Sequence, residues 1–222
     1  MQTRHEFHEE LAALDRQLLE MGTAAERMVG SAVSALRGGD VPLAESVLDQ
    51  DDAVDEMNRD IEARCMRLLA LQQPMARDLR LIGTALKVIT DVERIGDHAV
   101  DIAKIARRFT QQLHGSRPLV DVGPLAEMAQ SLLRRSLEAL VQRDADLAAR
   151  VVAEDDQIDE TFQSLRDALF SFAGSSTAPA AYTLLAMVYL ERIADHAVNI
   201  AERVSYVETG HLGPLTPPSE NG

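Results

Sequence analysis

The feature that most constrains this chain is an internal repeat. The eleven residues ERIGDHAVDIA at 93–103 recur as ERIADHAVNIA at 191–201, with nine identical positions at an offset of 98 residues. A second match, DDAVDE at 51–56 against DDQIDE at 155–160, lies at an offset of 104 residues. Self-similarity at this level indicates tandem copies of one structural unit. We therefore expect two versions of the same unit in one chain.

Hydrophobic residues recur at spacings of three and four through most of the chain, which is typical of helices that bury one face. Aromatic residues make up only 4% and Trp is absent, so the core must be built from aliphatic helix faces. Three helices joined by tight turns fold up and down. The sequence thus predicts an all-α fold, a tandem repeat of two antiparallel three-helix bundles with six long helices. Their approximate ranges are 5–36, 40–73, 75–109, 122–142, 144–172 and 179–207.

The overall charge limits the partners that the chain can bind. A formal net charge of -14 repels a nucleic-acid backbone, so we expect no nucleic acid and favour cationic partners or metal ions. The single cysteine, Cys65, excludes an internal disulfide. No stretch approaches the roughly 18 apolar residues of a membrane span, and the N-terminus lacks an apolar signal core. We expect a cytoplasmic protein that reaches a membrane only through partners.

Acidic residues spaced by four form a row along each repeated helix, because such residues share one helix face. With the apolar stripe centred on Ile95, these acids point away from the core. The rows are Glu93, Asp97 and Asp101 in the first copy and Glu191, Asp195 and Asn199 in the second.

The preceding helix of each copy carries acids at matching heights. In an antiparallel hairpin, residues equidistant from the turn lie level, and the paired positions are centred on 74 and on 175, both in predicted turns. Each half can thus gather four or more carboxylates from two helices. The level pairs are Asp55 with Glu93 and Asp51 with Asp97, then Asp159 with Glu191 and Asp155 with Asp195.

Such clusters are costly without a counter-ion, since each like-charged pair destabilises a helix by roughly 0.2–0.5 kcal/mol. Magnesium, manganese, iron and zinc ions all accept carboxylate oxygens, so the rows predict metal binding. A solvated acidic face, partly neutralised by Arg94 and Arg192, stays open as an alternative. His98 and His196 lie one residue off the rows, and we expect them to pack between helices or to support ligands.

The segments Glu93-Arg-Ile-Gly-Asp97 and Glu191-Arg-Ile-Ala-Asp195, with Gln73-Pro74 and Asp78-Leu79-Arg80, resemble the PhoU family, whose hallmark is a repeated Glu/Asp-x-x-x-Asp motif in two three-helix bundles. The internal repeat divides the chain into copies at 1–115 and 119–208, and the proline and glycine residues near the C-terminus predict a flexible tail at 209–222. The resemblance implies multinuclear iron or zinc sites and no organic cofactor. The ligands it implies are Glu93, Asp97, Asp101, Glu191 and Asp195. Asn199 replaces an acid, so the second site should bind more weakly.

The same resemblance implies a non-enzymatic regulator of phosphate uptake and of the phosphate-starvation response. Such a protein acts as an adaptor between the ATPase subunit of the phosphate ABC transporter and a phosphate-sensing histidine kinase, as a homodimer. The sequence has no phosphate-cradling glycine loop, nucleophile elbow or zincin helix. Two alternatives remain: a di-metal carboxylate enzyme or metal-storage protein, and a purely structural scaffold. The outward-facing acids and the missing Glu-x-x-His spacing argue against the enzyme.

Overall fold

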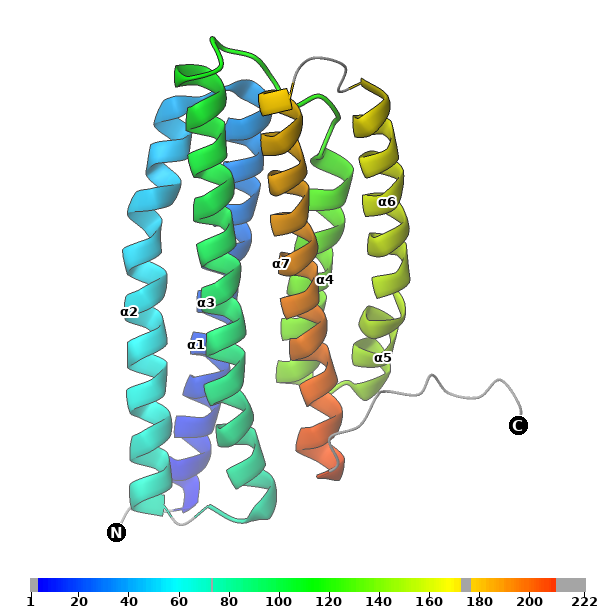
Figure 1. Cartoon of the computed structure of the whole chain (residues 1–222). Coiled ribbons are helices and arrows are strands. Elements are labelled where there is room, and N and C mark those ends of the chain that lie inside the picture. Colours follow the sequence, from blue (N-terminus) through cyan, green and yellow to red (C-terminus); the bar gives the residue numbers. More distant parts are fainter. Residues whose placement is uncertain (1–3, 73, 173–176, 211–222) are drawn as a thin grey trace, which may run out of the picture.

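The structure, a computed structural model, describes residues 4–72, 74–172 and 177–210, and all regular secondary structure in these ranges is helical (Figure 1). The predicted all-α class is confirmed. The predicted tail beyond position 210 and the second turn, centred on position 175, lie outside the described residues. The helices are α1 (Arg4–Gly38), α2 (Val41–Gln72), α3 (Ala76–Gln111), α4 (Gly123–Gln142), α5 (Ala145–Ala153), α6 (Asp155–Phe172) and α7 (Thr177–Thr209).

Local sequence signals explain where the helices begin and end. Gly39 takes a positive φ of 66° directly after α1, a conformation that glycine adopts without a steric penalty. The carboxylate of Asp40 then accepts a hydrogen bond of 3.0 Å from the backbone N–H of Leu43, which caps α2. Asp144 caps α5 in the same way through the N–H of Leu147, at 2.8 Å. These caps set the short turns that force neighbouring helices to run antiparallel.

The helix predicted over 144–172 is interrupted at Glu154, which divides it into α5 and α6. Around this residue the backbone makes tighter i to i+3 hydrogen bonds, from Glu154 N–H to Val151 O at 3.2 Å and from Gln157 N–H to Glu154 O at 3.1 Å. The Glu154 carboxylate also pairs with Arg135 of α4. One of the six long helices is therefore two collinear segments, a change that leaves the three-helix bundle intact.

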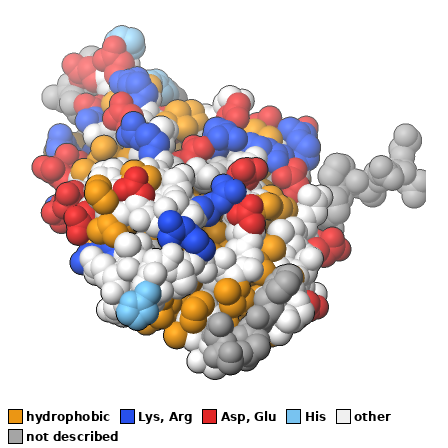
Figure 2. Space-filling view, turned by 90° about the horizontal axis from the view of Figure 1, so that it is seen from above, with side chains coloured by type: hydrophobic (Ala, Val, Ile, Leu, Met, Phe, Trp, Pro, Cys, Tyr) orange, Lys and Arg blue, Asp and Glu red, His pale blue; other side chains and the backbone are white. Residues whose placement is uncertain are grey.

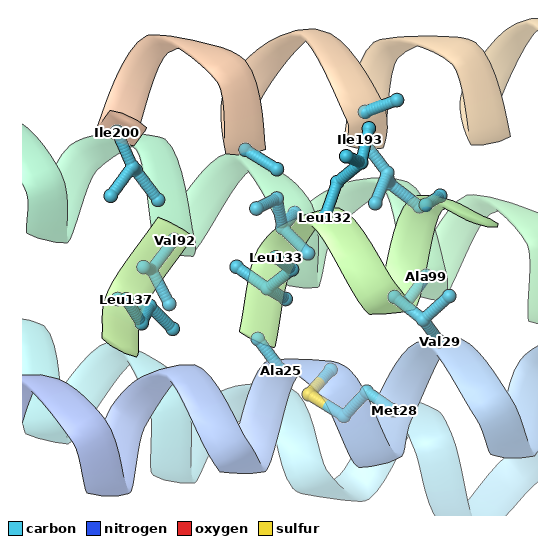
Figure 3. Packing of buried hydrophobic residues seen from close by; sticks show 14 of the residues in the cluster. Ala25, Met28, Val29, Val92, Ala99, Leu132, Leu133, Leu137, Ile193 and Ile200 are labelled. Atoms are coloured by element: carbon cyan, nitrogen blue, oxygen red, sulfur yellow. The ribbon is translucent and has the colours of Figure 1, made fainter. Parts of the chain in front are cut away.

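The chain forms two bundles that pack side by side. Helices α1, α2 and α3 contact one another, and so do α4, α7 and the α5–α6 pair, while α3 packs on α7 and α1 on α4 between the bundles. Buried hydrophobic residues of both halves therefore join into one core. Figure 3 shows Ala25 and Met28 of α1 together with Leu133 of α4 and Ile193 of α7 in this cluster. The two repeats therefore share one hydrophobic core.

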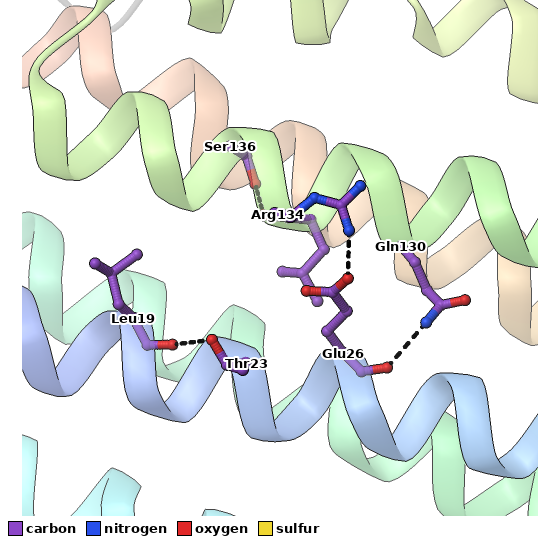
Figure 4. A network of polar contacts seen from close by, with 7 residues as sticks. Leu19, Thr23, Glu26, Gln130, Arg134 and Ser136 are labelled. Carbon is purple, nitrogen blue, oxygen red and sulfur yellow. Dashed lines mark hydrogen bonds and ion pairs between the residues drawn. The ribbon is translucent and has the colours of Figure 1, made fainter.

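Helices α1 and α4 approach each other closely because α1 carries a glycine at the crossing. A β-carbon built on Gly22 would stand 2.0 Å from the Leu137 Cδ1 atom, so no larger residue fits without a shift. Polar contacts line the same interface in Figure 4: the Arg134 guanidinium lies 2.7 Å from the Glu26 carboxylate, and the Gln130 amide donates to the Glu26 backbone oxygen at 3.1 Å. This interface fixes how the two bundles are oriented.

Candidate acidic metal sites

The structure places each predicted acidic row on a repeated helix and the matching acids on the helix beside it. The rows lie on α3 and α7, and their predicted partners lie on α2 and α6. Viewed end-on in Figure 2, acidic side chains gather along the edge on which Figure 1 places α2. Asp159 and Asp195 are exposed, and the other candidates are half-buried: Asp51, Asp55, Glu93, Asp97, Asp101, Asp155, Glu191 and Asn199.

In the first bundle, acids from α2 and α3 lie close enough to perturb each other. Burial raises the pKa of Asp51, and the charges of Asp55, Asp97 and Asp52 raise it further. The pKa of Glu93 is likewise raised, first by burial and then by Asp97, with Asp55 adding to the effect. These cross-helix couplings join the predicted level pairs, Asp51 with Asp97 and Asp55 with Glu93. The hairpin register inferred from the sequence is thus present in the structure.

The second bundle repeats this arrangement on α6 and α7. The pKa of Asp155 is raised by burial and then by Asp195 and Asp159. Burial also raises the pKa of Glu191, with Asp195 and Asp159 as the next causes. For Asp195 the burial effect is again largest; His196 lowers its pKa, and Asp159 raises it. Both copies therefore hold carboxylates that resist ionisation more than isolated ones do.

Basic side chains neutralise part of the first row. Arg94 lies 3.0 Å from the Asp97 carboxylate, and Lys104 lies 3.1 Å from Asp101, each three residues away on the same helix. These pairs are largely exposed, and pairs of this kind contribute only about 0–1 kcal/mol. They offset the repulsion without removing it, since the pKa of Asp51 and of Glu93 remains raised.

Carboxylate oxygens suit a hard or borderline cation, but the acidic side chains do not converge on one point in this structure. Within the described ranges, no three Asp, Glu, His or Cys side chains are gathered in a metal-binding arrangement. The carboxylates stand on rigid helices and keep part of their surface exposed, so rotation about side-chain bonds is what would bring their oxygens together. A bound cation would relieve the repulsion between carboxylates that lie at the same height on neighbouring helices.

The two histidines of the motif lie at the contact between α3 and α7. The ring of His98 stacks on Tyr189 with 5.5 Å between centroids, and it lies 5.8 Å from the ring of His196. Burial and the neighbouring His196 lower the pKa of His98, which favours a neutral ring. As expected from their position off the rows, both histidines pack between helices.

An acid that the sequence reading overlooked, Asp91, completes this contact. It is 8% exposed; one carboxylate oxygen lies 3.0 Å from Nδ1 of His196, and the other lies 3.4 Å from Nε of Arg203. Its position in the sequence could have indicated this contact, because Asp91 lies four residues before Ile95 on the apolar stripe. A buried acid at such a position needs a polar partner. At the repeat offset of 98, Tyr189 replaces it, so the two histidines have different partners.

Fold and site together define a class: all-α proteins made of two duplicated three-helix bundles, each with an acidic row beside its partner helix. A family profile described as "PhoU domain" matches this chain twice, at residues 18–106 and 122–204. The chain therefore belongs to the PhoU family. No helix in the described part of the chain combines the length and the apolar character that a membrane crossing requires.

Similar proteins match over nearly their full length. One relative, "Phosphate-specific transport system accessory protein PhoU homolog" of Clostridium acetobutylicum, is 36% identical, with 94% of this chain and 96% of the relative covered. The protein of the same description from Pseudomonas aeruginosa is also 36% identical, with 94% of this chain and 89% of the relative covered. The crystal structure of PhoU from Pseudomonas aeruginosa superposes with a TM-score of 0.86 at 36% identity, covering 92% of this chain and 100% of that one. The crystal structure of PhoU from Streptococcus pneumoniae superposes with a TM-score of 0.85 at 29% identity, covering 94% of this chain and 99% of that one.

Proposed function

We propose that this protein is an accessory regulator of phosphate-specific transport. The observation that carries the proposal is similarity through both repeats to relatives that are named accessory proteins of that system. The duplicated acidic rows lie within the two matched regions, so the shared sequence includes the candidate site. In this role the protein represses the phosphate-starvation response when phosphate is ample.

Within that role the protein acts in the cytoplasm as a non-enzymatic adaptor and as a homodimer. It connects the ATPase subunit of the phosphate ABC transporter with a phosphate-sensing histidine kinase, and it meets the membrane only through these partners. Two features support an adaptor: long, rigid helices present extended surfaces, and the sequence has no phosphate-cradling glycine loop, nucleophile elbow or zincin helix.

Each acidic row binds metal ions with the help of the acids on its partner helix. The ligands in the first bundle are Glu93, Asp97 and Asp101, supported by Asp51 and Asp55. Those in the second are Glu191, Asp195 and Asn199, supported by Asp155 and Asp159. Iron, zinc, magnesium and manganese fit these donors. The acids are partly exposed, whereas di-metal carboxylate enzymes direct theirs into the bundle core, which favours binding over catalysis.

The regulatory proposal is tested by deleting the gene and measuring alkaline phosphatase expression in ample phosphate. Deletion should raise expression, and the wild-type chain should restore repression. Glu127→Gln is a matched control that removes one exposed acid on α4, away from both rows, and it should restore repression equally. Affinity capture of the tagged full chain should recover the transporter ATPase subunit and the kinase. Unchanged repression after deletion, together with capture of neither partner, would refute the proposal.

A further inference from the structure

A cavity of about 360 Å³ opens between the N-terminal part of α3 and the C-terminal part of α7, away from both acidic rows. Its walls include three cationic side chains, Arg80, Lys87 and Arg203, although the whole chain carries a formal charge of -14. The Tyr206 ring lines it as well, so the cavity has an aromatic surface beside its positive charges. A concentration of positive charge in a strongly acidic protein is suited to an anion.

Both repeats contribute to this cavity, and the equivalent place between the N-terminal part of α7 and the C-terminal part of α3 lacks its three cations. At the offset of 98 residues, the positions of the three cations are occupied by neutral residues, namely Ala178 for Arg80, Leu185 for Lys87 and Ile105 for Arg203. Duplication of the fold therefore does not explain the three charges, because the equivalent positions fold without them.

At the equivalent position of the other repeat, Tyr182 corresponds to Thr84. Its hydroxyl group lies 3.4 Å from the Arg108 guanidinium, which also stands over its ring at 5.4 Å, and its ring meets the Phe109 ring edge-on at 6.2 Å. A tyrosine with its own partners thus stands in one repeat where the other has a smaller threonine that lines the cavity.

Two small residues keep the cavity open. Gly83 lies inside α3, where glycine costs about 1 kcal/mol relative to alanine, and the equivalent residue is Ala181. A β-carbon at Gly83 would meet no atom within 4 Å, so tight packing does not require the glycine. Thr84 is 3% exposed, and its hydroxyl oxygen has no hydrogen-bond partner among the described residues. A glycine inside a helix and a buried hydroxyl group without a partner are both unfavourable for stability, which is expected where space serves a ligand.

Two of the cations are held in position by the protein itself. The Nε of Arg80 donates a hydrogen bond of 3.0 Å to the backbone oxygen of Val207, near the end of α7. The Nε of Arg203 lies 3.4 Å from the buried carboxylate of Asp91. The hydrogen bond through Nε fixes the plane of the Arg80 guanidinium group, and the ion pair with Asp91 restrains Arg203, so less side-chain entropy is lost when a ligand binds.

We propose that this cavity binds a small molecule that carries a phosphate group. Arginine guanidinium and lysine ammonium groups commonly bind phosphate oxygens in proteins. The Tyr206 ring offers a surface on which an organic part of the ligand can stack. The cavity volume falls within the roughly 300–1,000 Å³ typical of ligand sites. The ligand is either inorganic phosphate or a phosphorylated compound such as a nucleotide. This binding site goes beyond the proposed regulatory function and does not depend on it.

Isothermal titration calorimetry on the full chain tests the proposal, with EDTA present so that cations on the acidic rows play no part. The probes are inorganic phosphate, adenosine 5′-monophosphate, and adenosine as the control that lacks a phosphate group. We expect saturable binding with one site per chain for at least one phosphate-bearing probe and none for adenosine. Binding of both phosphate-bearing probes assigns recognition to the phosphate group. Binding of the nucleotide alone adds a contribution from its organic body.

Two variants with matched controls connect binding to this cavity. Lys87→Leu removes an exposed charge and installs the residue of the other copy, and it should weaken binding about tenfold or more. Arg150→Leu, an exposed charge on α5, should leave binding unchanged. Gly83→Leu fills the cavity without a backbone clash and should abolish binding, whereas Ala181→Leu at the equivalent position should not. The proposal is overturned by no saturable binding of either phosphate-bearing probe, equal binding of adenosine, or wild-type affinity in Gly83→Leu.

Discussion

Replacement of Asp51 by asparagine should stabilise the metal-free protein, although it removes a charged residue from a folded surface. Asp51 lies on α2 among the carboxylates of Asp55, Asp97 and Asp52, and its pKa is raised first by partial burial and then by these charges. A carboxyl group whose pKa is raised by folding destabilises the folded state when it is ionised. The neutral amide of asparagine keeps the shape of the side chain and removes the repulsion.

The size of the effect follows from the contacts of Asp51. Three like-charged neighbours, at roughly 0.2–0.5 kcal/mol each, give a repulsion of about 0.6–1.5 kcal/mol. Attraction to Lys104 offsets about one such pair, so Asp51→Asn should raise the free energy of unfolding by roughly 0.4–1 kcal/mol. For a chain of this length, that change corresponds to an increase in Tm of roughly 1–4 °C.

Thermal unfolding followed by circular dichroism in EDTA measures this change. Glu127→Gln is the matched control, because Glu127 is exposed on α4 and has no charged residue three or four positions away. Its Tm should stay near that of wild type. With manganese or zinc added, the wild type should gain more stability than Asp51→Asn, since the variant has lost a supporting carboxylate. A metal-free Asp51→Asn protein no more stable than wild type would show that the acids do not repel one another as argued.

Three further predictions follow from the same structure. The Tm advantage of Asp51→Asn should shrink as the pH falls from neutral toward the raised pKa of Asp51, because protonation of the carboxylate relieves the wild-type repulsion; a constant gap contradicts this. Gly22→Ala should cost roughly 1–3 kcal/mol of unfolding free energy in urea titrations through its clash with Leu137, whereas Gly38→Ala, with no atom within 4 Å, should cost nothing. Burial raises the pKa of Cys65 to about 12, so iodoacetamide should label the native protein far more slowly than the urea-unfolded chain, and equal labelling rates would refute this.

Most of the fold could be predicted from the sequence because hydrophobic spacing and the internal repeat report directly on helices and their number. The level pairing of acids followed from the hairpin geometry alone, with Pro74 at the centre of the first turn. The interruption at Glu154 was missed because it consists of two i to i+3 hydrogen bonds, with neither glycine nor proline to signal it. A break of this size changes too little of the hydrophobic pattern to be seen.

The contacts between the bundles could not be predicted in the same way. Assigning one buried stripe to each helix places three helices around a core, but α3 and α7 also bury a second face against each other. Asp91 and its partners His196 and Arg203 occupy that second face, so an acid on the apolar stripe of its helix lies in a polar contact between repeats. The cavity beside Lys87 lies at the same contact, between α3 and α7, so it too depends on packing that one buried stripe per helix does not predict.

The most direct test of the account is the metal content of the purified protein, measured by inductively coupled plasma mass spectrometry without chelators at any step. Wild-type protein should retain iron, zinc or manganese, and Asp97→Asn/Asp195→Asn, which removes one acid from each row, should lose most of it while staying folded. The acidic rows would be no more than solvated surface if wild type carried no metal, or if the double variant carried as much.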